Sequence, residues 1–256
     1  MIQFIRNILA RRTFAYKARN KAMNMFSSYE NFKTIRETQE TKRKKENRPH
    51  EVLYFHKVDD PYSHLTIQYI DKFINGYDIN LKPILVGEEN PVTVHEPDLY
   101  DAYCLQDVKR IAPFYDVDFE ALSYPSKNLI SLANSILCNL EAEKFTSIAK
   151  EVSSALWLGQ EEKLKELNKI YNATDSEVSI KLNNGNEIRN NCDYYFGSAF
   201  YYEKELYWGV DRLNHLETRL AELGAKKTTD NEFICNLNTV APNAVSYTHL
   251  TLPTTS

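Results

Sequence analysis

The chain has 256 residues, of which 43% are hydrophobic and 26% are charged, a composition typical of one large or two small globular domains. No apolar run reaches the ~20 residues that a membrane-spanning helix needs, and arginines near the N-terminus interrupt the pattern of a secretory signal. The four cysteines form no Cys-x-x-Cys pair and match no zinc site, which favours reduced thiols and a cytoplasmic location.

The charge is distributed unevenly along the chain. Residues 1–49 contain 13 Lys/Arg and 4 Asp/Glu, whereas the remainder contains 18 Lys/Arg and 31 Asp/Glu. A basic arm therefore precedes an acidic body. The first 28 residues predict a basic amphipathic helix. Three functions fit it: weak contact of residues 1–29 with an anionic membrane surface, a phosphate-binding arm, or a mitochondrial transit peptide and hence a mitochondrial location. A helix docked on the acidic body, or a solvated arm, is the simpler interpretation, and we expect no nucleic-acid partner. Residues 41–48 predict an exposed, charged linker.

The first part of the body predicts a strand, a helix and a second strand. Residues 51–58 are apolar on both faces, which indicates a buried central strand. A helix over residues 60–76 follows, with Asp60 at its N-cap and Pro61 at its first position. Residues 78–85 form the second strand, where Pro83 indicates a sheet edge or a strand end. This order predicts a right-handed βαβ unit with parallel strands.

The second part predicts a helical block and then a hairpin with a closing helix. Residues 98–172 are expected to be helical, with a break near Leu158–Gly159, and a polar segment around LNNGNE follows them. Strands at 198–203 and 205–209 are joined by a tight turn, and the last helix ends at Gly224. The predicted fold class is therefore α/β and thioredoxin-like: βαβ, a helical insertion at about residues 95–190, a β-hairpin and a C-terminal helix.

The end of the chain has a different character. Residues 225–244 are predicted to be a linker. The stretch VSYTHLTLPTTS, residues 245–256, resembles the translated read-through of a sequencing adaptor. We therefore expect these residues to be an artefact, and the natural protein to continue past Ala244.

Two stretches, YFHKVDDPYSHL (54–65) and KELYWGVDRLNHLETRL (204–220), resemble the DsbA-like thioredoxin superfamily. They are most similar to the branch of 2-hydroxychromene-2-carboxylate isomerases and kappa-class glutathione transferases, over about residues 51–224. The resemblance implies a Ser or Cys facing the glutathione thiol, and a cis-proline that pairs with the bound thiol peptide. Asp60 and Ser198 occupy those two positions in this chain. The Gly-x-Asp-Arg turn of the branch is kept, and its Asp211 would meet the γ-glutamyl ammonium group of glutathione.

The candidate catalytic residues are Asp60 and Ser63, and the candidate substrate-binding residues are Tyr62, Ser198, Trp208, Asp211 and Arg212. A carboxylate at residue 60 is ionised without help from the helix, so it would cap the helix and repel a glutathione thiolate. Ser63 would need a nearby base, for which the two candidates are His56 and His64. The His64 side chain is expected to point elsewhere, because adjacent helical residues do not face each other.

Simpler structural roles compete with several of these assignments. His56, Asp59, Asp60 and His64 are better explained by a strand and a helix cap than by a metal site, so we expect no metal. Trp208 could serve hairpin packing instead of stacking on an aromatic substrate. Asp211 and Arg212 could cap the last helix instead of holding a ligand.

Three functions remain open. The first is a weakly catalytic or non-catalytic half of a longer tandem protein, which would work with a second thioredoxin-like repeat or as a homodimer. The second is a glutathione-dependent isomerase or transferase, in a superfamily that also contains oxidoreductases, acting on a small thiol or aromatic substrate. In that enzyme Asp60 would be a general base or an electrostatic group. The third is a scaffold that docks on a membrane or a partner through the basic N-terminal helix.

Overall fold

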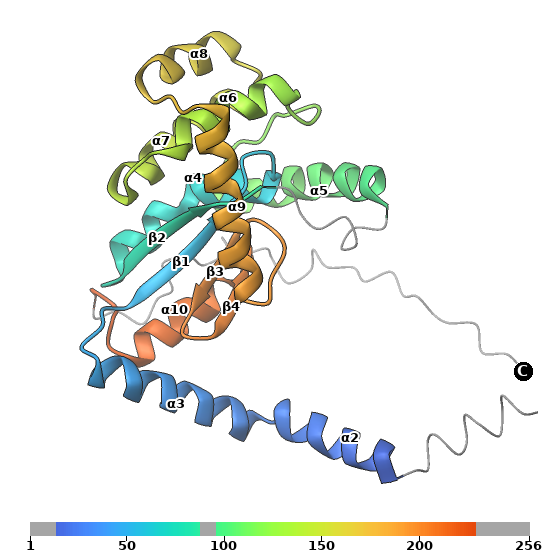
Figure 1. Ribbon diagram of the computed structural model, residues 1–256, viewed down its shortest axis with the longest axis vertical. Coiled ribbons are helices and arrows are strands. Elements are labelled where there is room, and N and C mark those ends of the chain that lie inside the picture. The colour runs from blue at the N-terminus through green and yellow to red at the C-terminus, as the bar shows by residue number, and fades with distance from the viewer. Residues whose placement is uncertain (1–13, 88–95, 229–256) are drawn as a thin grey trace, which may run out of the picture. The chain divides into compact units, whose positions relative to one another are not determined.

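The computed structural model describes residues 14–87 and 96–228 (Figure 1). The chain divides into two compact units, residues 1–49 and 50–256. The first half of the predicted N-terminal helix, most of the predicted linker 225–244 and the whole adaptor-like tail lie outside the described residues.

The first unit contains two helices, α2 (Phe14–Phe26) and α3 (Tyr29–Lys45). The Ser28 side chain caps α3 by accepting a hydrogen bond from the Asn31 N–H. The prediction of a linker at residues 41–48 is wrong for residues 41–45, which form the last turn of α3. Basic residues in a last turn are favourable because they face the negative end of the helix dipole.

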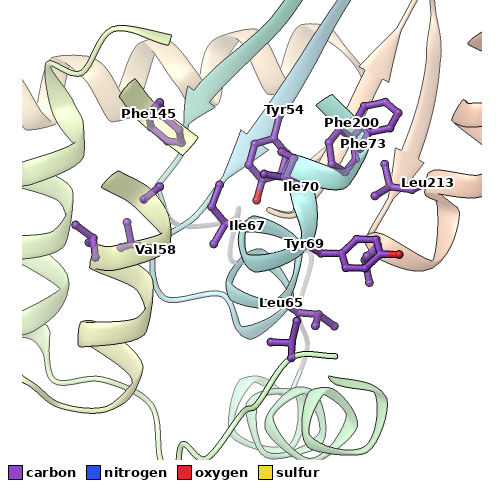
Figure 2. Packing of buried hydrophobic residues seen from close by; sticks show 14 of the residues in the cluster. Tyr54, Val58, Leu65, Ile67, Tyr69, Ile70, Phe73, Phe145, Phe200 and Leu213 are labelled. Atoms are coloured by element: carbon purple, nitrogen blue, oxygen red, sulfur yellow. The ribbon is translucent and has the colours of Figure 1, made fainter. Parts of the chain in front are cut away.

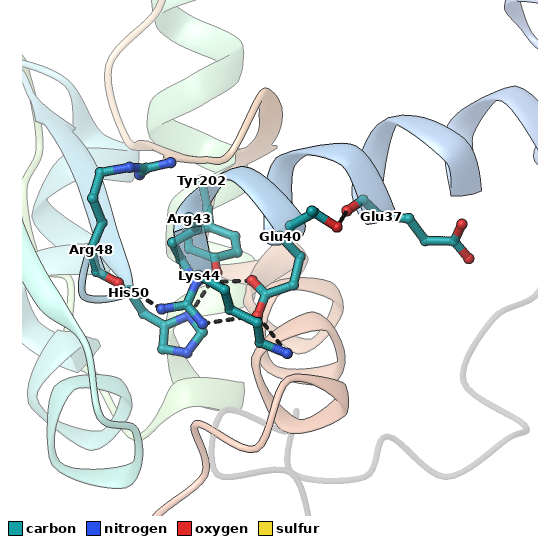
Figure 3. Close-up of polar contacts among 8 residues, drawn as sticks. Glu37, Glu40, Arg43, Lys44, Arg48, His50 and Tyr202 are labelled. Carbon is teal, nitrogen blue, oxygen red and sulfur yellow. Dashed lines mark hydrogen bonds and ion pairs between the residues drawn. The ribbon is translucent and has the colours of Figure 1, made fainter. Parts of the chain in front are cut away.

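Glu40 ties this last turn together (Figure 3). Its carboxylate lies 2.8 Å from Arg43 and 3.3 Å from Lys44, at the helical spacings that bring side chains together. The hydrogen bond from Arg43 lowers the pKa of Glu40 below its usual value. Arg43 also donates to the Arg48 carbonyl oxygen, which fixes the chain just after the helix.

The second unit is built on a four-stranded mixed sheet. Its strands are β1 (Glu51–His56), β2 (Asn80–Leu85), β3 (Ala199–Tyr202) and β4 (Glu205–Trp208), in the order β2-β1-β3-β4. β1 is parallel to β2 and antiparallel to β3, and β3 is antiparallel to β4. β1 is therefore an interior strand, and Pro83 lies on the edge strand β2, as the sequence predicts.

α4 (Pro61–Gly76) connects β1 to β2 and packs on one face of the sheet. Figure 2 shows Ile70 and Phe73 of this helix beside Tyr54 and Phe200 of the strands. The rings of Tyr54 and Phe200 are stacked with centroids 4.9 Å apart. α10 (Leu213–Glu222) adds Leu213 to the same cluster. Alternate strand residues, Phe55 and Ala199 among them, form a smaller cluster on the opposite face.

The predicted helical insertion is present. It comprises α5 (Pro97–Ile111), a 3₁₀ turn η1 (Ala112–Tyr115), α6 (Lys127–Cys138), α7 (Ala142–Trp157), α8 (Glu161–Ile170) and α9 (Asp175–Asn191). The chain breaks between α7 and α8 at Gly159, whose φ of 65° is easily reached only by glycine.

A second prediction was wrong. The polar LNNGNE segment lies inside α9, although α9 has no continuous apolar stripe. A capping box between Thr174 and Glu177 fixes its start, with the Thr174 N–H donating to the Glu177 carboxylate at 2.7 Å. Gly185 lets the helix lie directly on β2, because a β-carbon there would be 2.0 Å from the Leu85 carbonyl oxygen.

The predicted hairpin and closing helix are confirmed. Glu203 and Lys204 have φ values of 44° and 72°, as a two-residue hairpin turn with right-handed twist requires. The 3₁₀ turn η2 (Val210–Arg212) leads from β4 into α10, and Gly224 follows with φ 77°. No helix among the described residues is long and apolar enough to cross a membrane.

Candidate functional site

Asp60 caps the N-terminus of α4. One carboxylate oxygen accepts from the Tyr62 N–H at 3.1 Å, and the other accepts from the Ser63 N–H at 3.0 Å. The second oxygen also accepts from the Ser63 hydroxyl at 2.7 Å. The predicted cap is confirmed, and the carboxylate satisfies the first free N–H groups of the helix.

Ser63 is fully buried behind this carboxylate. Two histidines were candidates for its base, His56 and His64, and the His64 side chain points elsewhere, as expected; both histidines have other partners. The His64 Nδ1 lies 2.8 Å from the Ser153 hydroxyl, and the His56 Nδ1 lies 3.0 Å from the Tyr54 hydroxyl. Burial lowers the pKa of His64 to about 4 and that of His56 to about 3. The Ser63 hydroxyl donates to Asp60 instead, and it accepts from the Lys57 N–H at 3.3 Å.

Gly197 closes the space in front of this cap. A β-carbon at Gly197 would lie 2.8 Å from the Asp60 Oδ2 and 3.0 Å from the Ser63 Oγ. Real β-carbons essentially never approach other atoms within 3.0 Å, so the backbone at residue 197 already rests against both groups. Any side chain at residue 197 would therefore have to displace the cap, and glycine avoids this clash.

Ser198, at the position of the cis-proline, has a different geometry. The described residues contain no cis peptide bond, and Ser198 has a φ of 51°, in the left-handed region that non-glycine residues rarely adopt. Its hydroxyl is buried and lies 2.7 Å from the Thr66 hydroxyl. The structure thus places the Ser198 side chain in the core, and its role in substrate binding stays a prediction.

Tyr62 also lines an open pocket. Its volume is about 340 Å³, and it brings together four of the predicted site residues: Tyr62, Trp208, Asp211 and Arg212. Asp60, Ser63 and Ser198 do not line it. The remaining lining residues are Tyr103, Asp107, Ile111, Tyr115, Gly209 and Val210.

α5 and η1 supply the wall that the sequence analysis missed. Tyr103, Asp107 and Ile111 recur every four residues, so they lie on one face of α5. The Tyr62 hydroxyl donates to the Asp107 Oδ2 at 2.7 Å and joins this wall to α4. The four-residue spacing was visible in the sequence, but it also fits a helix that simply packs against the core.

The turn before α10 contributes the carboxylate of Asp211 to the pocket. Gly209 has a φ of 79°, and a β-carbon there would lie 2.7 Å from the Asp211 Oδ1. Burial raises the pKa of Asp211 above its usual value, and Arg212, 3.6 Å away, opposes this shift. Burial and the hydrogen bond to Asp107 raise the pKa of Tyr62, so its hydroxyl stays protonated.

A row of stacked rings continues from the pocket. The Trp208 ring is 6.1 Å from Tyr62 and stacks on Phe196 at 5.4 Å, and Phe196 stacks on Tyr100 at 5.6 Å. Phe196 directly precedes Gly197, so this row connects the pocket wall to the segment that covers Asp60. Within the described ranges, no group of three or more His, Cys, Asp or Glu side chains could hold a metal ion.

The sheet order, the α4 cap and the helical insertion define a DsbA-like thioredoxin fold, as the resemblance implied. Among solved structures, the chain is similar to 2-hydroxychromene-2-carboxylate isomerase, with a TM-score of 0.52. The sequence identity is 16%, and the match covers 68% of this chain and 96% of that chain. At this identity the likeness establishes the shared fold alone. No protein-family model matches the chain, and no curated protein matches it.

The Asp60 cap makes a testable contribution to stability. We expect Asp60→Ala to lower the free energy of unfolding by roughly 2 kcal/mol, because two helix N–H groups and the buried Ser63 hydroxyl lose their acceptor. Urea unfolding of the full chain measures this. Asp59→Ala is the matched control, since Asp59 makes one ion pair, with Lys57 at 3.4 Å, and should change stability by less than ~1 kcal/mol. Equal losses in both variants would contradict the capping role.

Proposed function

We propose that the second unit is a ligand-binding domain of DsbA-like fold that no longer performs thiol chemistry at the N-terminus of α4. The contact of Gly197 with Asp60 and Ser63 is the observation that carries this proposal. In this fold a reactive thiolate depends on free N–H groups and on the positive end of the helix dipole. Here the carboxylate of residue 60 accepts the hydrogen bonds of the Tyr62 and Ser63 N–H groups.

The ligand site of this proposal is the pocket beside Tyr62 and Trp208. Aromatic rings there offer apolar contact to a small thiol peptide such as glutathione or to an aromatic molecule. Asp211 lines the pocket and would accept from the ammonium group of a peptide ligand, as the resemblance implies. The volume of about 340 Å³ suits a small molecule.

Calorimetric titration of the full chain with glutathione tests this proposal. We expect binding that Trp208→Leu weakens, whereas Leu206→Ala, on the same strand but outside the pocket, leaves it unchanged. Asp60→Cys provides a second measurement: its thiol is expected to react with iodoacetamide no faster than a free cysteine. Rapid alkylation of that thiol would show that the helix N-terminus is open, and would contradict the proposal.

The second candidate function is a glutathione-dependent isomerase in which Asp60 acts as a base or an electrostatic group. Tyr62, Trp208 and Asp211 line one pocket, and this supports it, because the resemblance implies that Asp211 meets the ammonium group of glutathione. Glutathione-dependent turnover of an aromatic substrate that Asp60→Asn abolishes would establish this function. Absence of turnover with intact glutathione binding would favour the binding domain.

A nucleophile could also come from outside this unit. We propose that a second thioredoxin-like repeat of the same protein, or a second copy in a homodimer, supplies it. Sequencing the genomic locus past codon 244 tests the first arrangement. A further strand-turn-helix with Ser-Pro-Tyr or Cys-Pro-Tyr would support it, and an early stop codon would contradict it.

A further inference from the structure

The pocket beside Tyr62 combines aromatic rings with negative charge. Four of its lining side chains are aromatic: Tyr62, Tyr103, Tyr115 and Trp208. The faces of tyrosine and tryptophan rings carry partial negative charge, and they attract ammonium groups within about 6 Å of the ring centre. A pocket with several such rings stabilises an organic cation better than a neutral molecule of the same shape.

The charged side chains of the pocket favour the same kind of ligand. They are two carboxylates, Asp107 and Asp211, and one guanidinium group, Arg212. Arg212 lies 3.6 Å from Asp211, so it offsets that charge. Asp107 forms no ion pair with a basic side chain of residues 14–87 or 96–228, and it accepts a hydrogen bond from the neutral Tyr62 hydroxyl.

The charge of Asp107 matters once a ligand fills the pocket. A neutral or anionic ligand would remove water from this carboxylate without pairing it, which is costly. A cation would replace that water with an attractive charge. The Asp107 charge also contributes to raising the pKa of Asp211, which means that the two carboxylates repel each other, and a cation would relieve this repulsion.

We propose that this pocket selects a small organic cation, whose ammonium group lies between the aromatic rings and Asp107. The inference rests on the proposed ligand-binding function and specifies the chemical class of the ligand. It differs from the contact at Asp211 that the resemblance implies, because Asp107 belongs to α5, outside both stretches that carry the resemblance.

The test compares choline with 3,3-dimethylbutan-1-ol, a neutral molecule of nearly the same shape, on the full chain. Binding is followed by the indole N–H resonance of Trp208, assigned with Trp208→Phe. We expect choline to bind at least about tenfold more tightly than the alcohol, and Asp107→Asn to remove most of that preference. Asp98→Asn is the matched control, because it removes the same charge from an exposed site on the same helix outside the pocket.

The outcomes separate this inference from the proposed function. Equal affinity for the two probes would overturn cation selection and leave ligand binding intact. Binding of glutathione, without any preference for choline over the alcohol, would also overturn cation selection and leave ligand binding intact. If choline, the alcohol and glutathione all fail to shift the Trp208 resonance, both proposals are wrong. Tyr62→Phe removes the hydrogen bond that Asp107 accepts but leaves the negative charge of Asp107 in place. The preference for choline should therefore persist in this variant.

Discussion

Gly185→Ala is expected to destabilise the second unit by about 3 kcal/mol or more, as an overpacking substitution against backbone. The added β-carbon would lie 2.0 Å from the carbonyl oxygen of Leu85 and 3.0 Å from its carbonyl carbon. Backbone atoms of β2 cannot rotate away as a flexible side chain can, so α9 and β2 would have to separate. Urea unfolding followed by circular dichroism measures the loss.

Gly87→Ala is the matched control for this substitution. Gly87 follows β2 and faces the same helix, where its N–H donates to the Asn186 side chain at 3.0 Å. A β-carbon there would meet its nearest neighbour, the Asn186 amide nitrogen, at 3.4 Å, which is ordinary contact. We expect a change below ~1 kcal/mol. A similar loss in both variants would show that the close approach of Gly185 to Leu85 is unimportant.

The same contact explains why α9 could not be predicted from the sequence. Two asparagines and a glycine in succession, NNG at 183–185, have low helix propensity and occur often in turns. The helix forms because Gly185 permits a close approach to β2 and because Thr174 and Glu177 cap its start. Long-range packing overrides local preference here. By contrast, the β1-α4-β2 unit was predictable, because each segment carries both its apolar pattern and its boundary residues.

In the candidate site, too, one part could be predicted from the sequence and another could not. Asp60 and Pro61 are residue types that favour the start of a helix, so the cap of α4 could be predicted from neighbouring residues. The wall that includes Asp107 could not, because its meeting with Tyr62 joins residues that are 45 positions apart. The closure at Gly197 involves a still larger separation from Asp60. Sequence patterns identify helix ends and faces, whereas the contacts that shape this pocket depend on tertiary packing.

Acidification from pH 7 to pH 5 is expected to lower the free energy of unfolding by about 4 kcal/mol through two buried histidines. Burial holds the pKa of His56 at about 3 and that of His64 at about 4, whereas both are near 6.5 in the unfolded chain. Between these values the unfolded state binds more protons than the folded state, so stability falls as the pH falls. Well above pH 6.5 both states are neutral at these residues, and their contribution is constant.

Removing one of these histidines should remove its share of the pH dependence. His64→Gln cannot take up a proton, so the loss of stability between pH 7 and pH 5 should shrink by about 2 kcal/mol, even if the variant is less stable at every pH. His215→Gln is the matched control, since His215 is exposed on α10. Urea unfolding at a series of pH values gives the slope of the unfolding free energy against pH for both variants.

A slope in His64→Gln equal to that of the parent protein would mean that His64 becomes protonated in the folded state as easily as in the unfolded one. That result would contradict its burial against Phe119 and Trp157, whose rings lie 5.3 and 6.2 Å from the imidazole.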